Sequence, residues 1–142
     1  MSNNYRFSFP TTIHFGAGTR KMVASHLKDQ GLKRPLIVTD KGLADLGFFK
    51  TFAVEIQRTG LDTTVFSGIW GNPVKSQVIS GVDAYRTHRA DCIIGIGGGA
   101  ALDVAKAIAL MATHTGDLFD YEDTPQGKPI QNNIPYWVAL PT

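Results

Sequence analysis

The sequence predicts an α/β fold, in which a parallel sheet is flanked by helices on both of its faces. Short apolar runs alternate along the chain with segments in which apolar residues recur every three to four positions. The longest runs are apolar at nearly every position, which is typical of strands covered on both faces. Three consecutive glycines separate one such run from the helix that follows it.

The first part of the chain is expected to hold two extended pieces and a helix. Residues 6–9 and 12–15 have the composition of short extended segments. A helix is predicted to begin at Thr19, a suitable N-cap residue, and to continue to about Gln30. Gly31 is expected to be the glycine that terminates this helix.

The middle of the chain repeats an alternation of strand and helix. Strands are predicted over residues 36–40 and 62–66, with a helix around residues 48–56 between them. A third helix is expected over residues 74–85, followed by a buried strand over residues 90–96. This order of elements indicates a parallel sheet.

The last part of the chain is expected to contain a helix, a loop and a strand. An alanine-rich helix follows the glycines and ends near His114, and residues 116–134 have a loop composition. Residues 136–140 predict the last strand, after which the chain stops. Functional loops of parallel sheets follow the carboxyl ends of strands, so we expect the chain to be the N-terminal part of a longer protein.

The composition is that of one soluble globular domain without a strongly charged surface. The 142 residues are 43% hydrophobic and 18% charged, with a formal net charge of +2. Such a small charge does not indicate a nucleic-acid or anionic-membrane partner. No apolar stretch reaches the ~18–20 residues that span a bilayer, and the N-terminus lacks a signal pattern, so a cytoplasmic location is expected.

The cysteine and the histidines are expected to have no catalytic or metal-binding role. The single cysteine, Cys92, lies in an apolar run and is expected to be an unreactive core residue. The four histidines show no i, i+3 or i, i+4 spacing, so we expect surface or supporting residues rather than metal ligands. They are His14, His26, His88 and His114.

The glycine triplet Gly97-Gly98-Gly99 is the most informative feature of the sequence. Glycines can adopt positive φ angles and let an anion approach the backbone closely. The first N–H groups of the following helix lack partners within the helix, and the helix dipole is positive there. The turn is therefore expected to bind a phosphate group, with the helix held close to the sheet by a face of mostly small residues. These residues are Ala101, Val104, Ala105, Ile108, Ala109 and Ala112.

The glycine pattern alone leaves alternatives open. Residues 95–100 match G-x-G-x-x-G/A, but they follow the third long strand, whereas a conventional Rossmann fingerprint follows the first. No acidic residue ends a strand ~20 residues later, and the sequence contains no G-K-[ST] of a P-loop. A turn that serves only the packing of the helix is the alternative interpretation.

Residues 97–106, GGGAALDVAK, resemble the GGGSxxDxAK motif of the iron-containing (group III, metal-dependent) alcohol dehydrogenases. Further similar segments follow in the family's order over essentially the whole chain. They are Phe15-Gly16-Ala17-Gly18, Leu36-Ile37-Val38-Thr39-Asp40, Asn72-Pro73 and Val138-Ala139-Leu140-Pro141-Thr142. The resemblance implies that residues 1–142 form a Rossmann-like NAD(P)-binding domain of the type shared by dehydroquinate synthase and iron-containing alcohol dehydrogenases.

The resemblance also implies which residues bind the cofactor. The glycine turn with residue 100 would hold the pyrophosphate, and Asp40 would lie near the adenosine ribose. Asn72 would lie beside the cofactor, Thr142 near the adenine, and Asp103 in the first turn of the helix, toward the cleft. The implied set is Asp40, Asn72, Gly97, Gly98, Gly99, Ala100, Asp103 and Thr142.

Asp40, Asp103 and Ala100 allow more specific expectations about cofactor binding. A carboxylate at Asp40 accepts hydrogen bonds from a 2′-hydroxyl and repels a 2′-phosphate, which favours NAD over NADP. The alternatives are a turn-forming or N-capping role for Asp40 and a favourable helix-start charge for Asp103. Ala100 replaces the serine usual in the family, and the lost hydroxyl contact weakens cofactor binding by roughly 0.5–1.5 kcal/mol.

For the longer protein the resemblance implies an oxidoreductase that transfers a hydride between an alcohol or aldehyde and nicotinamide. A divalent metal, Fe or Zn, would be held by one Asp and three His of a second, helical domain, so this chain is expected to bind cofactor with little or no turnover. Glycerol dehydrogenase and dehydroquinate synthase relatives remain alternatives, as do a flavodoxin-like regulator and a non-enzymatic nucleotide-binding module. The two N-terminal extended pieces are candidates for pairing across a homodimer.

Overall fold

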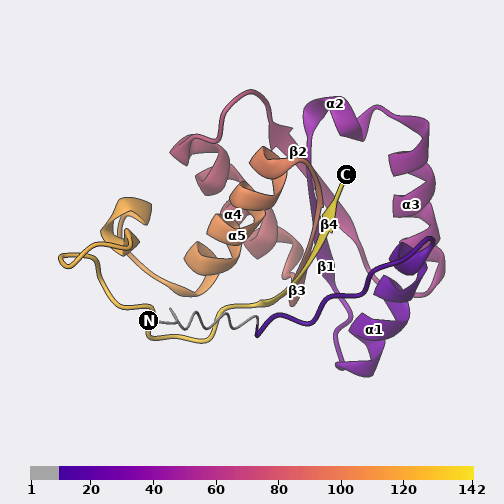
Figure 1. Ribbon diagram of the computed structural model, residues 1–142, viewed down its shortest axis with the longest axis horizontal. Helices are drawn as coiled ribbons and strands as arrows, with labels where there is room; N and C mark the ends of the chain where they lie inside the picture. The colour runs from indigo at the N-terminus through magenta and orange to yellow at the C-terminus, as the bar shows by residue number, and fades with distance from the viewer. Residues whose placement is uncertain (1–9) are drawn as a thin grey trace, which may run out of the picture.

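One four-stranded parallel sheet, covered by helices on both faces, forms the centre of the molecule in a computed structural model that describes residues 10–142 (Figure 1). The helices are η1 (Thr19–Met22), α1 (Val23–Asp29), α2 (Lys41–Ala44), α3 (Gly47–Arg58), α4 (Lys75–His88), α5 (Gly99–Thr113) and η2 (Leu118–Tyr121), and the strands are β1 (Pro35–Asp40), β2 (Thr64–Ile69), β3 (Cys92–Gly97) and β4 (Tyr136–Pro141). The predicted α/β fold class is confirmed.

The strand order is β2-β1-β3-β4, so the chain moves outward from β1 to β2 and then crosses back to place β3 on the other side of β1. In the register of the sheet, Leu36 of β1 lies between Thr64 of β2 and Ile93 of β3. β3 pairs along its whole length with β4, from Cys92 with Tyr136 onward. All four carboxyl ends therefore meet at one edge of the sheet, where ligands bind in folds of this type.

The two faces of the sheet carry separate apolar cores. Side chains alternate between the faces along each strand, so that Ile37 and Ile94 belong to one core and Leu36 and Ile93 to the other. The first core is completed by α1 and α3 and the second by α4 and α5, on opposite sides of the sheet in Figure 1. This arrangement explains why the strands are apolar at consecutive positions.

Helix α5 lies close to β3 because small residues line the contact. A Cβ atom added at Gly95 would lie 2.9 Å from Cβ of Ala105, closer than packed carbons approach one another. The small-residue face predicted for this helix is buried except at Ala112, which is half-buried. The helix is thereby held with its N-terminus directly beyond the end of β3.

The N-terminal predictions are confirmed only in part. Residues 6–9 lie outside the described part of the chain, and residues 12–15 form no strand. Thr19 is not the N-cap of an α-helix: it begins the 3-10 turn η1, its hydroxyl donates to the Gly16 carbonyl at 3.0 Å, and α1 starts four residues later. Gly31 does end α1, with φ +78° and the paired backbone bonds of a Schellman motif.

Strand β2 lies further along the chain than the sequence predicts. It covers Thr64–Ile69 rather than residues 62–66, and Ile69 is fully buried. The N–H of Asp62 donates to the Lys33 carbonyl in the loop before β1, so Asp62 lies before the paired part of β1 and β2 and is not part of the strand. A register shift between Val38 and Asp40 of β1 lets the pairing continue to Ile69.

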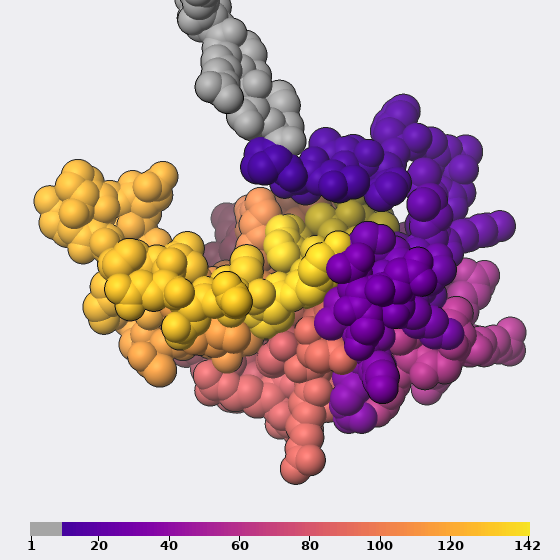
Figure 2. All heavy atoms as spheres, turned by 90° about the horizontal axis from the view of Figure 1, so that it is seen from below, coloured from indigo at the N-terminus to yellow at the C-terminus, as the bar shows by residue number. Residues whose placement is uncertain are grey.

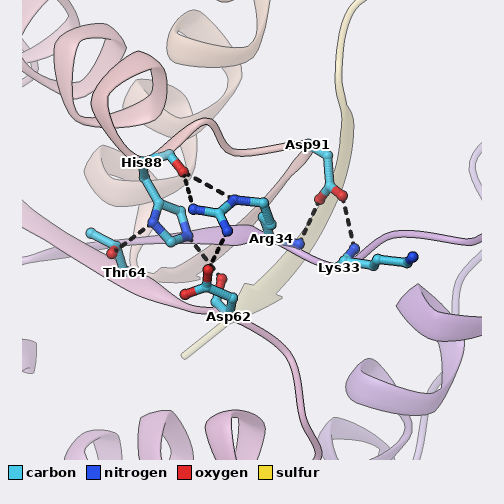
Figure 3. A network of polar contacts seen from close by, with 6 residues as sticks. All are labelled: Lys33, Arg34, Asp62, Thr64, His88 and Asp91. Carbon is cyan, nitrogen blue, oxygen red and sulfur yellow. Dashed lines mark hydrogen bonds and ion pairs between the residues drawn. The ribbon is translucent and has the colours of Figure 1, made fainter.

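The amino edge of the sheet is closed by hydrogen bonds to one carboxylate (Figure 3). Asp91, just before β3, accepts bonds from the backbone N–H groups of Lys33 at 2.8 Å and Arg34 at 2.9 Å. Burial raises the pKa of Asp91, but these backbone donors outweigh it and hold the pKa below its usual value. The carboxylate therefore ties the start of β3 to the start of β1.

Arg34 and His88 extend this network to β2 and α4. The guanidinium of Arg34 donates to the His88 carbonyl from Nη2 at 2.7 Å and from Nε at 3.2 Å, and pairs with Asp62. The ring of His88 contacts Thr64 Oγ1 at 3.0 Å and the Asp62 carbonyl at 2.8 Å (Figure 3). One polar cluster thus joins the ends of four elements.

The segment between α5 and β4 forms an arm that projects from one side of the molecule (Figure 2). It is the predicted loop, and His114 at its base is buried, in keeping with the supporting rather than the surface role expected of the histidines. The His114 ring contacts the Leu110 carbonyl through Nδ1 at 2.8 Å and accepts from the Asn132 N–H at Nε2. Among the described residues, no helix is long and apolar enough to cross a membrane.

Candidate functional site

A cavity of about 300 Å³ lies at the carboxyl edge of the sheet, on the side where Figure 1 shows α2 and the C-terminus. It is formed where β1 and β2 end and α5 begins. Its lining residues are Asp40, Lys41, Gly42, Ile69, Trp70, Gly71, Gly98, Ala100 and Ala101. The chain turns toward α2 after β1 and toward α5 after β3, which are on opposite faces, so the cavity lies at the point where the connections diverge.

The three glycines of the turn differ in their surroundings. Gly97 is buried with φ +144°, and a Cβ atom there would lie 2.8 Å from Cβ of Ala101. Gly98 and Gly99 are exposed, and an added Cβ at either would meet no atom within 4 Å. Gly97 is thus required by the packing of the turn, whereas the other two leave their outer faces open to a ligand.

The start of α5 presents backbone donors beside these glycines. Gly98 is the N-cap residue, without a side-chain cap, and the first bond of the helix runs from Leu102 N–H to the Gly98 carbonyl at 3.1 Å. The N–H groups of residues 99–101 precede that bond and have no acceptor within the helix. Together with the helix dipole they favour an anionic group at this position.

Asp40 is the N-cap of α2 and also lines the cavity. Its Oδ1 accepts a hydrogen bond from the Leu43 N–H at 2.8 Å, so Asp40 is the N-cap of α2. Its side chain also lines the cavity, and Oδ2 lies 3.2 Å from the position of an added Cβ at Gly97. One carboxylate oxygen therefore orders the backbone after β1, while the other lies close to the glycine turn.

The structure brings together some of the residues implied by resemblance and not others. Asp40, Gly98 and Ala100 line one cavity. Asn72 is exposed and follows the lining residue Gly71, but it does not itself line the cavity. Gly99 lies beside the cavity wall at the start of α5.

Asp103 and Thr142, the last two residues of the implied set, do not line the cavity. Asp103 is exposed and begins the second turn of α5, so the expectation that it lies in the first turn is wrong. Because α5 starts at Gly99, the first turn contains no acidic residue, which also removes the helix-start charge as an explanation. Thr142 donates its N–H to the Gly97 carbonyl at 3.0 Å, on the β4 side of the turn.

Six lining residues are not among the predicted site residues: Lys41, Gly42, Ile69, Trp70, Gly71 and Ala101. Trp70 directly follows the buried end of β2. Lys41 and Trp70 also line a second, more open hollow of about 520 Å³, together with Ser67 and Gly68. The signal that could have revealed Lys41 and Trp70 is their position immediately after strand ends, which in a parallel sheet marks the ligand edge.

Metal ligands and a reactive thiol are not assembled in the described part of the chain. No group of three His, Cys, Asp or Glu residues suited to a metal ion occurs within residues 10–142. Cys92 is fully buried in β3, and burial raises the pKa of its thiol, as expected of an unreactive core cysteine. His14 and His26 lie 6.3 Å apart between ring centroids, and His26 Nε2 contacts the Tyr136 hydroxyl at 2.6 Å.

Comparison with known proteins relates the chain to a group of dehydrogenases. Over its full length it is 31% identical to a choline dehydrogenase of Bacillus subtilis, of which it covers 35%. It is 38% identical to the NAD-dependent methanol dehydrogenase of Bacillus methanolicus over 82% of the chain and 30% of that protein. The chain thus spans about a third of the length of these relatives.

Solved structures show the same arrangement. The sulfoacetaldehyde reductase of Bifidobacterium kashiwanohense, determined in complex with NAD⁺, superposes with a TM-score of 0.84 at 28% identity. The match covers 99% of this chain and 36% of that one. Residues 10–142 also match the sequence profile of the iron-containing alcohol dehydrogenases. On this evidence, the chain belongs to the iron-containing alcohol dehydrogenase family.

Proposed function

We propose that these residues are the nucleotide-binding domain of an NAD-dependent, metal-dependent alcohol dehydrogenase. The observation that carries the proposal is the cavity at the carboxyl edge of the sheet, which joins Asp40, the glycine turn and the start of α5. Its volume of about 300 Å³ is at the lower end of the range of small-molecule sites. The proposed ligand is a dinucleotide whose phosphates lie at the turn.

Each part of the cavity has a role in this proposal. The N–H groups at the start of α5 hold the pyrophosphate, and the open faces of Gly98 and Gly99 let it approach the backbone. Oδ2 of Asp40 accepts a hydrogen bond from a ribose hydroxyl while Oδ1 keeps its bond to Leu43. When bound, the nicotinamide ring accepts or donates the hydride of the reaction.

The metal site that the family implies is not assembled within residues 10–142. No group of three His, Cys, Asp or Glu side chains that could hold a metal ion occurs among these residues. No step of the proposal therefore depends on a metal bound here. We propose instead that a second domain supplies the divalent ion, Fe or Zn, and that residues 1–142 alone bind cofactor with little or no turnover.

The finer parts of the proposal concern substrate, cofactor and location. A small alcohol or aldehyde is the proposed substrate, which is supported by relatives named for methanol and for 1,3-propanediol. NAD is proposed over NADP because a carboxylate at Asp40 repels a 2′-phosphate. A relative that is named as NAD-dependent supports the same choice of cofactor. A cytoplasmic location stays a prediction from the sequence, which shows neither a bilayer-length apolar stretch nor a signal pattern.

Isothermal titration of NAD⁺ and NADP⁺ into the chain tests the proposal. Asp40→Asn is the decisive variant because it keeps an oxygen that can cap α2 and removes the charge. NAD⁺ should bind more tightly than NADP⁺ to the wild type, and the variant should lose most of this difference. Asp45→Asn, an exposed acid after α2, is the matched control. Equal affinity of the wild type for both dinucleotides would contradict the role of Asp40.

A further inference from the structure

A buried histidine joins the end of α5 to the arm that follows it (Figure 2). His114 directly follows α5 and is only 5% exposed. The arm contacts its ring twice, first through Tyr121 of η2 and again through Asn132 shortly before β4. The Tyr121 ring packs edge-on against it, with centroids 5.3 Å apart. A titratable group is thus enclosed at the base of the arm, at the opposite end of α5 from the cavity.

The two backbone partners of the His114 ring fix its protonation state. Nδ1 lies 2.8 Å from the Leu110 carbonyl, which can only accept, so Nδ1 carries a hydrogen. Nε2 lies 3.2 Å from the backbone N–H of Asn132, which can only donate, so Nε2 presents its lone pair. The two contacts together require the neutral ring in its Nδ1–H form. A protonated ring would keep the first bond and replace the second by two opposed N–H groups.

The carboxylates of the arm are engaged elsewhere. Asp117 pairs with Lys75 of α4 at 2.5 Å, and Asp120 pairs with Lys128 at 2.7 Å. The hydrogen bond from each lysine holds the pKa of its aspartate below the usual value, so both carboxylates stay ionised where histidines titrate. The other acids of the arm, Glu122 and Asp123, are exposed to solvent. Within residues 10–142, His114 therefore has no ion pair that would stabilise its protonated ring.

The remaining neighbours of the ring do not favour a positive charge either. Arg86 of α4 contacts the Met111 carbonyl at 3.5 Å, so the last turn of α5 already faces a cation. The Tyr121 hydroxyl donates to the Thr115 carbonyl at 2.6 Å and is occupied by this bond. Thr113 Oγ1 contacts Nδ1 at 3.2 Å, on the ring nitrogen that bears a hydrogen in either protonation state. None of these groups compensates a protonated ring for the bond that it loses.

We propose that His114 is a pH-sensitive clamp for the return segment of the arm, residues 122–134, and releases this segment when its ring is protonated. Histidine is the side chain whose charge ordinarily changes between about pH 5 and 8. With the neutral ring, Asn132 is held by its N–H bond to Nε2 and by a bond from Nδ2 to the Thr113 carbonyl at 2.7 Å. Protonation breaks the first bond and opposes two donors, so the return segment detaches, while η2 stays bound to α4 through Lys75.

NMR spectroscopy of the ¹⁵N-labelled chain tests the state of the ring. At about pH 7.5 the His114 ring should show a protonated Nδ1 and an unprotonated Nε2. As the pH falls, the ring nitrogens of His114 and the backbone amide of Asn132 should titrate with one common midpoint. An Nε2–H ring at neutral pH would overturn the clamp. An Asn132 amide that does not respond while His114 titrates, or a ring that stays neutral until the whole chain unfolds, would also overturn it.

Amide hydrogen exchange tests the release of the return segment. Protection is expressed relative to an unstructured amide, which removes the intrinsic effect of pH on exchange. Residues 122–134 should be about 10-fold less protected at about pH 5.5 than at about pH 7.5, as expected for one lost buried hydrogen bond. The amides of β3 should keep their protection, because the release is local. Equal protection of residues 122–134 at both pH values would overturn the proposal.

His114→Gln is the decisive variant for the exchange experiment. Glutamine can both donate to the Leu110 carbonyl and accept from the Asn132 N–H, but it does not take up a proton in this pH range. The return segment of the variant should be equally protected at both pH values. His14→Gln, which alters an exposed histidine, is the matched control and should keep the wild-type pH dependence.

The outcomes for His114→Gln separate the clamp from other acid-sensitive groups. A loss of protection on acidification as large as that of the wild type would show that another group controls the arm, and would overturn the proposal. If glutamine fails to hold the arm at either pH, the coupled titration of His114 and Asn132 in the wild type decides by itself. Cofactor binding does not enter either measurement, so the outcome is independent of the proposed function.

Discussion

The two ends of the sheet are built in opposite ways. At the amino edge, Asp91 and Arg34 join the starts of β1 and β3 to the end of α4 through hydrogen bonds to backbone groups, and Arg34 pairs with Asp62 before β2. At the carboxyl edge, the strands end in an exposed turn of glycines, helix donors without intrahelical acceptors and an exposed indole. One edge satisfies its polar groups internally and the other leaves them available, so the first serves stability and the second is free to bind a ligand.

The sharpest test of this contrast compares two adjacent glycines. Gly97→Ala should lower the free energy of unfolding by roughly 2–4 kcal/mol, because the new methyl group meets Ala101 and φ is +144°. Gly98→Ala should change stability by less than about 0.5 kcal/mol, because its methyl group points into open space. It should weaken NAD⁺ binding instead.

Chemical denaturation and titration of NAD⁺ on both glycine variants measure these effects. Each variant is the control for the other, since they differ by one position in the same turn. A Gly98→Ala chain that binds NAD⁺ as tightly as the wild type would contradict a ligand at the open face of the turn.

At the amino edge, Asp91→Asn should cost about 2 kcal/mol of stability, because two bonds from backbone donors lose their charged acceptor. The pKa of Asp91 is lowered in the folded state, so its contribution is present above the unfolded pKa and is lost as the pH falls through the folded pKa. The variant should therefore show a weaker dependence of unfolding free energy on pH in the acidic range. An unchanged acid profile would argue against this carboxylate as the main link.

A smaller effect is expected from a hydroxyl next to the site. Thr39 is fully buried, and its Oγ1 has no hydrogen-bond partner among residues 10–142. Thr39→Val should raise the free energy of unfolding by about 1 kcal/mol, since it removes an unsatisfied polar atom without changing the shape. Thr64→Val at the amino edge should instead lower the free energy of unfolding, because its hydroxyl contacts His88. Thermal unfolding of the two variants measures both changes.

The smallest change in unfolding free energy is expected for the solvent-exposed ion pair at the amino edge. Asp62→Asn removes the ion pair with Arg34, in which both side chains are more than one-third exposed. Its cost should stay below about 0.5 kcal/mol and should shrink further in high salt. A cost as large as that of Asp91→Asn would show that the ion pair, rather than the backbone bonds, holds this edge.

Much of the fold follows from local patterns in the sequence. The strands β1 and β3 are apolar at consecutive positions because both of their faces are covered, and this pattern locates them within one or two residues. Strand β2 is an edge strand whose pattern is mixed, with Val65 exposed and Ile69 buried, so the sequence predicts its end at Phe66. Its true extent depends on its register with β1, which no local pattern encodes.

The same error in the predicted end of β2 explains why Trp70 is not among the predicted site residues. Because the sequence predicts an end to β2 three residues too early, it places Trp70 in a loop instead of at a strand end. The sequence does point to Asp40 and the glycine turn, because each lies at the end of a strand whose end is predicted to within one residue. The sequence does not decide between a surface and a supporting position for His114, because its partner Asn132 is 18 residues away and meets it only in the folded arm.

The central position of β1 also has a consequence for how the chain is made. β1 is complete at residue 40, but the strand that covers its second edge begins at residue 92. While the ribosome adds the intervening residues, a highly apolar strand offers unpaired backbone groups to any other strand it meets. Helix α3 and β2 can assemble on it early, whereas its other edge must wait for β3. We expect the nascent chain to be prone to aggregation during this interval.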